Sequence, residues 1–223
     1  MPTSKTIDFK LLETILYEPG KGFYLLDRHF NRLLASAQFF EINAPSSNKI
    51  EKEMQERVKQ HGDIPQKVRV LVDKTGGLIV EAYPLIANAR TDPTIVLDTQ
   101  PVSSEDIFLR HKTTHRPYYE RARARADVPA TYQDVVLYNE RGEITETSIC
   151  NIAVEMEDGT WITPSVECGC LAGTMRSELL EKGEIQCGIV TVVELAKASK
   201  EGRGIKIFNS VSGIMNVQLD LKS

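Results

Sequence analysis

The sequence contains no run of about eighteen apolar residues, so we expect no transmembrane helix. It also has no excess of basic residues, because the formal net charge is -4 and the isoelectric point is near 5.7. A nucleic-acid-binding surface normally shows such an excess, so nucleic acid is not an expected partner. Met1 leads into polar residues rather than an apolar signal region, which predicts an intracellular, cytoplasmic protein that acts on small molecules.

Cysteine is scarce, with four residues in a chain of 223: Cys150, Cys168, Cys170 and Cys187. One residue separates Cys168 from Cys170, whereas structural zinc sites usually leave about two to four and need a second pair. We therefore expect neither a metal site nor a disulfide framework. The remaining composition is ordinary for a globular protein, with 41% hydrophobic and 26% charged residues, and the length allows one large domain or two small ones.

The first part of the chain predicts two hairpins separated by two helices. Apolar segments flank a glycine-rich turn in the first hairpin, at 9–26. From Asp27 the apolar residues fall close to helical spacing, and 46–61 reads as a second helix with a serine cap. Alternating valines and a double-glycine turn predict the second hairpin at 67–83.

Apolar periodicity is lost at 87–93, where we place a linker between a small α+β domain at 1–86 and a larger domain at 94–223. The mixture of hairpins and helices predicts an α+β fold rather than a doubly wound parallel sheet. In the larger domain the sequence predicts strands at 94–98, 109–112, 134–138, 143–146, 151–156, 160–163, 189–193 and 205–210, and helices at 118–126, 174–182 and 195–200.

Lys112 lies in the most distinctive stretch, which reads Arg-His-Lys-Thr-Thr-His-Arg-Pro-Tyr-Tyr-Glu from Arg110 to Glu120. Hydroxyl, histidine and arginine side chains around a lysine can hydrogen-bond or repel its ammonium group, and both effects favour a nucleophilic amine. We therefore take Lys112 as the candidate catalytic residue. The alternative is a solvated basic turn, because lysines are mostly exposed.

Four further motifs follow in order, at 139–151, 163–164, 171–176 and 208–213. They read Asn-Glu-Arg-Gly-Glu-Ile-Thr-Glu-Thr-Ser-Ile-Cys-Asn, Thr-Pro, Leu-Ala-Gly-Thr-Met-Arg and Phe-Asn-Ser-Val-Ser-Gly. With these motifs the sequence resembles the class IV aminotransferase family. These are the fold type IV pyridoxal-phosphate (PLP) enzymes, which include branched-chain aminotransferases, D-amino-acid aminotransferases and aminodeoxychorismate lyases. The resemblance extends over nearly the whole chain.

The resemblance implies the two-domain α+β fold of D-amino-acid aminotransferase, with PLP in the interdomain cleft. Family members usually carry a further strand or two before the first hairpin, and only Met1 to Asp8 precede it here. We therefore expect the small domain's sheet to be shortened at its N-terminal strand. The resemblance also implies a homodimer.

The resemblance further implies a role for each motif residue. Lys112 matches the family's Schiff-base lysine, which also moves the substrate α-proton. Arg32 matches the arginine of a histidine-x-x-arginine-leucine motif that holds the cofactor phosphate; a surface pairing with Asp27 or Glu41 is its alternative. Glu146 matches the glutamate that keeps the pyridine nitrogen protonated.

Asn151, Thr174, Met175 and Ser210 are the other expected cofactor contacts, again by resemblance. Thr174 and Met175 begin a predicted helix, and a helix N-terminus is a common phosphate site. Their alternative is a plain capped helix and turn. Arg69 is a candidate substrate contact, with an outward-facing strand arginine as its alternative.

One position departs from the family pattern. Some members place a tyrosine five residues after the lysine to contact the cofactor's phenolic oxygen, and that position is Pro117 here. Tyr118 and Tyr119 lie just beyond it, and Tyr118 is also a candidate substrate contact. Either the register shifts by one residue, or Arg116 or His115 takes over.

The leading functional hypothesis is an aminodeoxychorismate lyase, because the Glu13-Thr14 strand and the ending at 209–213 are most similar to that group. The first alternative is a PLP-dependent transaminase, since both reactions begin with proton removal by Lys112. The second is a cofactor-free binding protein on the same fold, because fold alone does not determine function.

Overall fold

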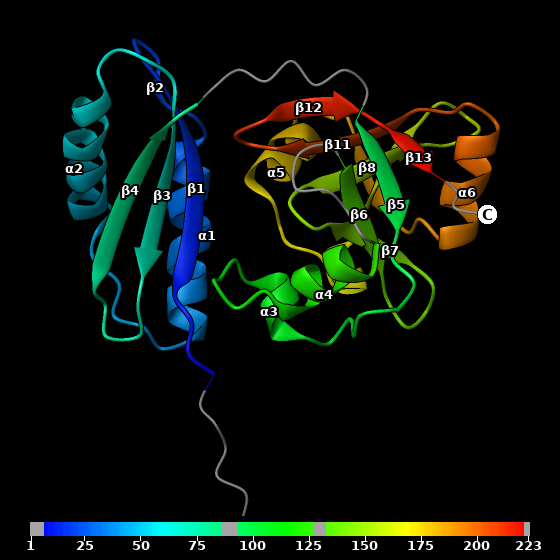
Figure 1. Cartoon of the computed structure of the whole chain (residues 1–223), viewed down its shortest axis with the longest axis horizontal. Helices are drawn as coiled ribbons and strands as arrows, with labels where there is room; N and C mark the ends of the chain where they lie inside the picture. The colour runs from blue at the N-terminus through cyan, green and yellow to red at the C-terminus, as the bar shows by residue number, and fades with distance from the viewer. Residues whose placement is uncertain (1–6, 86–92, 127–132, 221–223) are drawn as a thin grey trace, which may run out of the picture. The chain divides into compact units, whose positions relative to one another are not determined.

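A computed structural model describes residues 7–85, 93–126 and 133–220 (Figure 1). The chain forms two compact units. The N-terminal unit contains Met1–Ile86 and His111–Arg116, and the C-terminal unit contains Ala87–Arg110 and Pro117–Ser223. Most of the linker predicted at 87–93 lies outside the described residues.

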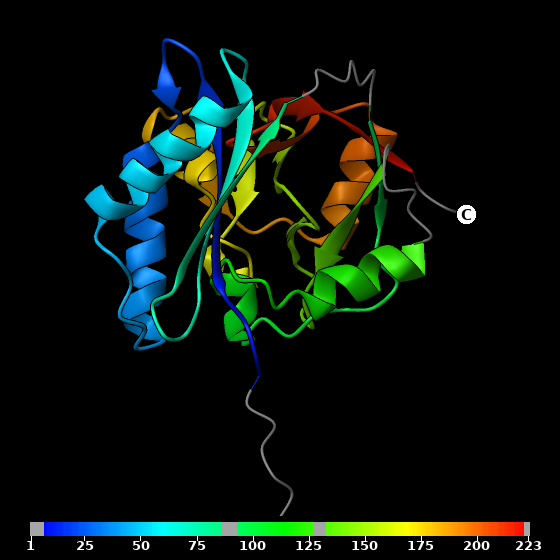
Figure 2. The same cartoon turned by 60° about the vertical axis from the view of Figure 1, so that its left-hand side comes forward.

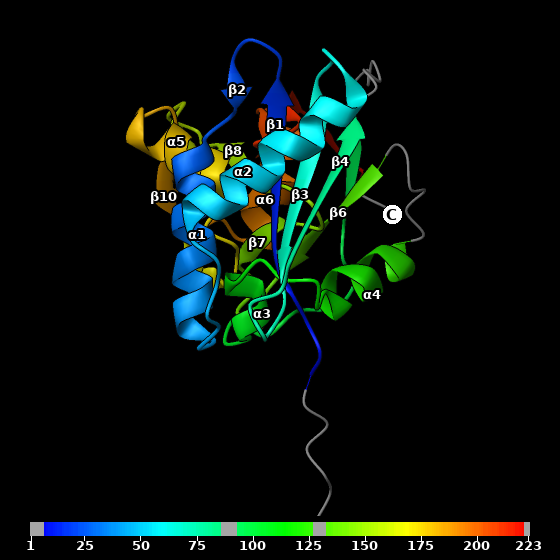
Figure 3. The same cartoon turned by 90° about the vertical axis from the view of Figure 1, so that its left-hand side faces the viewer.

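The N-terminal unit is a four-stranded antiparallel sheet with two helices on one face. Its elements are β1 (Leu11–Glu18), β2 (Gly22–Phe23), α1 (Leu26–Phe39), α2 (Ser47–Val58), a short 3-10 turn η1 (Lys59–His61), β3 (Gln66–Val72) and β4 (Leu78–Pro84), in the sheet order β2-β1-β3-β4. Figure 3 shows α1 and α2 in front of this sheet. Both predicted hairpins and both predicted helices are confirmed.

The strand register explains why one face of this sheet is buried. Glu13 of β1 lies opposite Val70 of β3, so both side chains are on the same face, and Glu13 contacts α1 through His29.

Helix α2 of the same unit begins at the Ser46 cap, whose hydroxyl accepts the backbone N–H of Lys49 at 3.4 Å. Its buried stripe of Ile50, Met54 and Val58 then recurs every four residues.

The C-terminal unit is built on two sheets, with strand orders β10-β9-β8-β11-β12 and β13-β5-β6-β7. Its strands are β5 (Thr94–Leu97), β6 (Gln133–Tyr138), β7 (Ile144–Thr147), β8 (Asn151–Glu155), β9 (Trp161–Pro164), β10 (Gln186–Gly188), β11 (Ile205–Asn209), β12 (Gly213–Asn216) and β13 (Gln218–Asp220). Its helices are α3 (Ile107–Arg110), α4 (Pro117–Ala126), η2 (Val166–Cys168), α5 (Thr174–Glu181) and α6 (Val192–Lys200).

Alternation along β8 shows how this unit is layered. Ile152 and Val154 face a core shared by both sheets and α6, whereas Ala153 between them packs with Leu179 of α5. On the other sheet, Val135 of β6 packs with α4. The two sheets therefore enclose the main apolar core, and α4 and α5 cover their opposite outer faces (Figure 2).

Three predictions for the second half of the chain are wrong. The β-branched run at 189–193 is not a strand, because the Thr191 hydroxyl accepts the N–H of Glu194 at 3.1 Å and so begins α6. Residues 109–112 are not a strand either, because Asp106 accepts the N–H of Phe108 at 2.8 Å and starts the helical turn α3. The strand predicted at 205–210 is present but is not the last, since β12 and β13 follow.

No helix within the described ranges is long and apolar enough to cross a membrane. The segment that carries Lys112 pairs with β1: Thr113 forms a bridge with Leu11, and the N–H of Thr114 donates to Lys10 at 2.9 Å. These bonds explain why 111–116 groups with the N-terminal unit although its flanks belong to the other unit.

Leu195→Ala should destabilise the protein by about 2 to 5 kcal/mol, because its side chain is completely buried in the main core of the C-terminal unit. Val193 lies on the same helix with 77% of its surface exposed, so Val193→Ala is the matched control and should change stability little. Urea unfolding of both variants measures the difference. Equal effects would contradict the placement of α6.

Candidate active site

Glu146 is a buried acidic side chain of the C-terminal unit with donors from three segments. Its Oε1 accepts the hydroxyl of Tyr119 at 2.6 Å and the N–H of Leu171 at 3.2 Å, and its Oε2 accepts the Asn151 side-chain amide at 3.1 Å. The residue is only 5% exposed. Hydrogen bonds from three donors favour the charged form of a carboxylate and oppose the effect of burial, so the arrangement suits a partner that carries positive charge.

Asn151 connects Glu146 to the start of α5. Its amide Nδ2 also donates to the carbonyl of Leu171 at 2.9 Å. A Cβ atom on Gly173 would lie 1.9 Å from the Asn151 Oδ1, so any larger residue directly before the helix would displace the Asn151 side chain. The carboxylate and the helix N-terminus are thereby held close together.

Thr174 and Met175 form the first turn of α5, as the sequence predicts. Thr174 is buried at the helix N-terminus, and Met175 packs against the cluster of Leu179 and Phe208. The N-terminus of a helix carries the positive end of its dipole, which favours an anion such as a phosphate. The first turn therefore offers the right polarity for the predicted contact.

Ser210 follows the end of β11 in a turn ordered by Asn209. The Asn209 Oδ1 accepts the N–H groups of Val211 and Ser212 at 2.9 and 2.8 Å. Strand β11 pairs with β8, and Phe208 lies opposite Asn151. The turn after β11 therefore lies at the same end of the two strands as Asn151. The structure thus brings together Glu146, Asn151, Thr174, Met175 and Ser210 in one unit.

Arg32 belongs to the N-terminal unit and pairs with Glu13, not with Asp27 or Glu41. Its Nε and one terminal nitrogen donate to the two Glu13 oxygens at 2.8 and 2.5 Å. The same carboxylate contacts His29 Nδ1 at 2.7 Å. This forked pairing fixes the arginine's plane in a partly buried position, which is unlike the surface arginine of the alternative interpretation.

The ionisation of this cluster follows from its surroundings. Burial raises the pKa of Glu13, but the charge and hydrogen bonds of Arg32, with those of His29, outweigh it and lower the pKa from 4.5 to about 2. Burial lowers the pKa of His29, and Arg32 and Lys112 lower it further against the opposing effect of Glu13. His29 is therefore neutral at pH 7 and its charged neighbours include Lys112.

The backbone on both sides of Lys112 is fixed within the N-terminal unit. Its carbonyl accepts the N–H of Leu12 at 3.0 Å. The preceding His111 hydrogen-bonds Ser36 at 2.9 Å and stacks on Phe39 with ring centroids 4.3 Å apart. The candidate nucleophile is thus carried by an irregular but well-anchored segment rather than by the predicted strand end.

Both candidate substrate contacts have partners of their own. Arg69 donates to Glu81 directly across the β3–β4 pair at 2.9 Å, which favours the outward-facing alternative. Tyr118 donates to Asp106, a bond that raises the pKa of the phenol. The sequence analysis assigned no role to Tyr119, although its helical spacing with the small residue Ala122 marks the buried face of α4.

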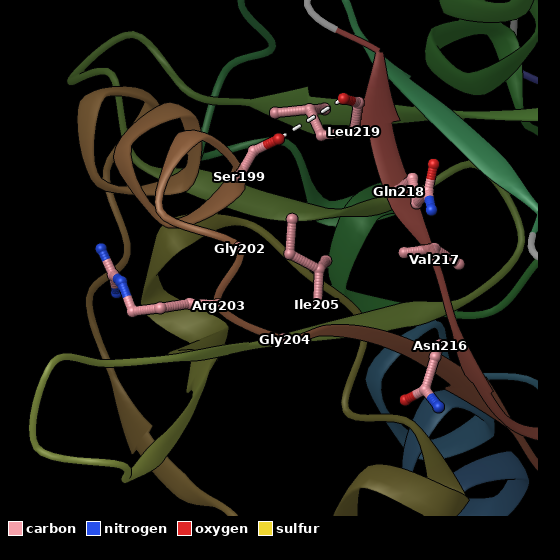
Figure 4. Close-up of a pocket in the computed structure, with 9 residues that line it drawn as sticks. All are labelled: Ser199, Gly202, Arg203, Gly204, Ile205, Asn216, Val217, Gln218 and Leu219. Carbon is pink, nitrogen blue, oxygen red and sulfur yellow. Dashed lines mark hydrogen bonds between the residues drawn. The ribbon is translucent and has the colours of Figure 1, made fainter.

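A cavity of about 440 Å³ lies elsewhere in the C-terminal unit (Figure 4). It is lined by Ser199, Gly202, Arg203, Gly204, Ile205, Asn216, Val217, Gln218 and Leu219. Arg203 points away from the other lining residues and pairs with Glu194 at 2.7 Å and Glu201 at 2.8 Å. None of the predicted site residues lines this cavity, so it is separate from the candidate site.

Comparisons with known proteins identify the family of this chain. A family model described as amino-transferase class IV matches residues 10–219. A Schizosaccharomyces pombe protein, provisionally named aminodeoxychorismate lyase, is 36% identical over 90% of this chain and 85% of its own length. The aminodeoxychorismate lyase of Saccharomyces cerevisiae is 27% identical over 94% of this chain and 71% of its own length.

Solved structures agree as well. A Mesorhizobium loti protein, provisionally named amino-acid aminotransferase, has a TM-score of 0.85 at 29% identity and covers 96% of this chain and all of its own. The 4-amino-4-deoxychorismate lyase of Pseudomonas aeruginosa has a TM-score of 0.77 at 22% identity, covering 95% of this chain and 83% of that one. At 22% identity, the similarity to the P. aeruginosa structure shows only that the fold is shared.

The family match and the curated relative define a PLP-dependent enzyme, and the solved structures show the fold type IV architecture. The chain belongs to the class IV aminotransferase family. The donor set fits the cofactor: Glu146 offers a charged carboxylate for a pyridine nitrogen, and the Gly173 position, where no Cβ fits, leads into a helix start suited to phosphate. The cofactor-free alternative finds no support here.

Acid should weaken the fold through Glu13 and His29. Glu13 has a depressed pKa, so its stabilisation is complete above about pH 4.5 and is lost as pH falls through about 2, a change of about 3 kcal/mol. Neutral His29 likewise loses stabilisation as pH falls below its usual 6.5. Chemical unfolding across this range measures both losses.

Glu13→Gln should be less stable than the wild type at neutral pH, and the difference should shrink between about pH 4.5 and 2. Glu53→Gln, at an exposed position on α2, is the matched control. A difference for Glu13→Gln that stays constant over this range would show that the carboxylate is not held in its charged form.

Proposed function

We propose that this chain is an aminodeoxychorismate lyase that converts 4-amino-4-deoxychorismate into 4-aminobenzoate and pyruvate. The observation that carries the proposal is the 36% identity to the S. pombe protein over 90% of the chain, joined by the named S. cerevisiae enzyme. The Glu146 site supplies the charge that this chemistry needs at a cofactor ring.

We propose one residue set for the cofactor. Lys112 is the catalytic residue, and the cofactor contacts are Arg32, Lys112, Glu146, Asn151, Thr174, Met175 and Ser210. Support for the phosphate contacts is their chemistry: a forked guanidinium held by Glu13 and a helix N-terminus with a buried threonine. Support for Glu146 is its burial with three donors.

When bound, PLP supplies an electron sink for the negative charge left when a proton leaves the carbon next to the substrate amine. The proton goes to Lys112 Nζ, which acts as base and then as acid. Glu146 keeps its negative charge at the ring nitrogen, because the Tyr119 hydroxyl and the Asn151 amide stabilise the carboxylate. Pyruvate leaves as the six-membered ring of the substrate becomes aromatic.

A transaminase is the second candidate, favoured by the M. loti structure with its TM-score of 0.85 at 29% identity. It would use Lys112 and Glu146 in the same roles but return the proton to the cofactor carbon and exchange the amino group. Arg69 and Tyr118 remain candidates for a substrate contact in either case. We also propose a cytoplasmic homodimer, on the resemblance to the family.

The first test is an assay of the PLP-loaded protein with 4-amino-4-deoxychorismate and no 2-oxo acid. A lyase should release 4-aminobenzoate and pyruvate in equal amounts, whereas a transaminase should need a 2-oxo acid acceptor and form no pyruvate. Lys112→Ala should abolish the product and the yellow colour of the loaded protein while remaining folded. Lys21→Ala, at an exposed turn lysine of the same unit, is the control and should keep both.

Glu146→Gln should retain cofactor and colour but lose roughly 100- to 1,000-fold in turnover, because the amide keeps the shape and removes the charge. The loss should appear in the exchange of the substrate α-hydrogen with solvent, which reports proton removal. Glu143→Gln is the matched control, since Glu143 pairs with Arg141 instead. A silent Glu146→Gln with a damaging Glu143→Gln would reverse the assignment.

A further inference from the structure

Within the C-terminal unit, the Tyr119 hydroxyl lies closer to the Glu146 carboxylate than the Leu171 and Asn151 donors described above. The hydroxyl lies 2.6 Å from Oε1, against 3.2 Å for the Leu171 N–H and 3.1 Å for the Asn151 amide on the other oxygen. A hydroxyl–carboxylate distance in this range is typical of a charge-assisted bond. Both residues are nearly buried, so water screens this bond little.

Neighbouring Tyr118 shows that the arrangement is specific to one position of α4. Consecutive residues on a helix point about 100° apart, and the Tyr118 hydroxyl donates to Asp106 instead. The Tyr119 ring packs among buried residues of the C-terminal unit, including Val135 and Leu137 of β6. Packing thus fixes the direction of the Tyr119 ring, and through it the direction of the hydroxyl.

The Glu146 carboxylate affects a neighbouring thiol, and both of its oxygens accept hydrogen bonds. Burial raises the pKa of the Cys170 thiol, and the negative charge of Glu146 raises it further. Tyr119 and Leu171 hold Oε1 while Asn151 holds Oε2, so the plane of the carboxylate is fixed at both oxygens. The Tyr119 donor can be removed by substitution with phenylalanine, which keeps the aromatic ring in place.

From this geometry we infer that Tyr119 is a positioning residue for the cofactor's ring nitrogen, which it serves by holding the Glu146 carboxylate in its orientation and in its charged form. The tyrosine keeps its own proton, and no bond is made or broken at it. The inference rests on the proposed role of Glu146 toward PLP. It gives a role to a residue of the 110–120 stretch that the sequence analysis left without one.

Tyr119→Phe tests the inference because it removes the hydroxyl and keeps the ring. The affinity of the cofactor-free protein for PLP should fall roughly tenfold to a hundredfold, as expected for one lost bond to a charged group. In the cofactor-saturated protein, exchange of the substrate α-hydrogen should slow by a similar factor with an unchanged KM. Tyr83→Phe, at an exposed tyrosine of β4, is the control and should leave the PLP affinity as it is.

A cofactor analogue separates positioning from a general structural effect. In 1-deazapyridoxal 5'-phosphate a carbon replaces the ring nitrogen, so Tyr119→Phe should not weaken its binding. In the Glu146→Gln background the same substitution should have no further effect on PLP affinity. Equal losses for PLP and the deaza analogue, or additive losses in the double variant, would overturn the inference.

The outcomes also distinguish this inference from the proposed function. A protein that binds no PLP, or whose Lys112→Ala variant keeps full colour and turnover, would contradict the proposed site. A protein that binds PLP through Lys112 but gives wild-type affinity and exchange in Tyr119→Phe would overturn the role of Tyr119 alone. Thermal unfolding of each variant confirms that the comparisons are made on folded protein.

Discussion

The C-terminal unit depends on keeping a charged carboxylate inside a folded protein. An unpaired charge in such a place costs several kcal/mol, so Glu146 is tolerable only while its donors stay in place. Those donors come from α4, from the first residue of β8 and from the loop before α5, and Gly173 adds a steric limit beside Asn151. The hydrogen bonds of this one carboxylate therefore connect α4, β8 and the loop before α5, which are distant in sequence.

The N-terminal unit also contains a buried carboxylate, Glu13, which pairs with Arg32 and His29. Glu13 sits on the helix-covered face of its sheet, and a cation, Arg32, compensates it rather than neutral donors alone. A fixed guanidinium can still recognise a phosphate, because its plane is already oriented before a ligand arrives. The N-terminal unit thus holds its buried carboxylate with a cation, whereas in the C-terminal unit a hydroxyl, a side-chain amide and a backbone N–H hold Glu146.

Sequence periodicity predicted most elements, and motif order predicted the family, because both depend on local spacing. The failures have local causes that spacing does not show. The β-branched run at 189–193 includes a helix start because the Thr191 hydroxyl accepts the N–H of Glu194. The strand predicted at 109–112 is absent because Asp106 accepts the N–H of Phe108 and begins α3. Tyr119 was assigned no role because its hydroxyl donates to Glu146, a residue 27 positions away in the sequence.

The segment at 111–116 has a consequence for how this protein could be divided. It is ordered by β1 and α1, yet the chain on either side of it belongs to the C-terminal unit. A gene fragment ending before residue 87 would encode the sheet without its lysine, and the complementary fragment would encode the lysine without the strand that orders it. Neither half is a transferable module, so recombination between relatives at this boundary has to keep β1 and the lysine segment matched to each other.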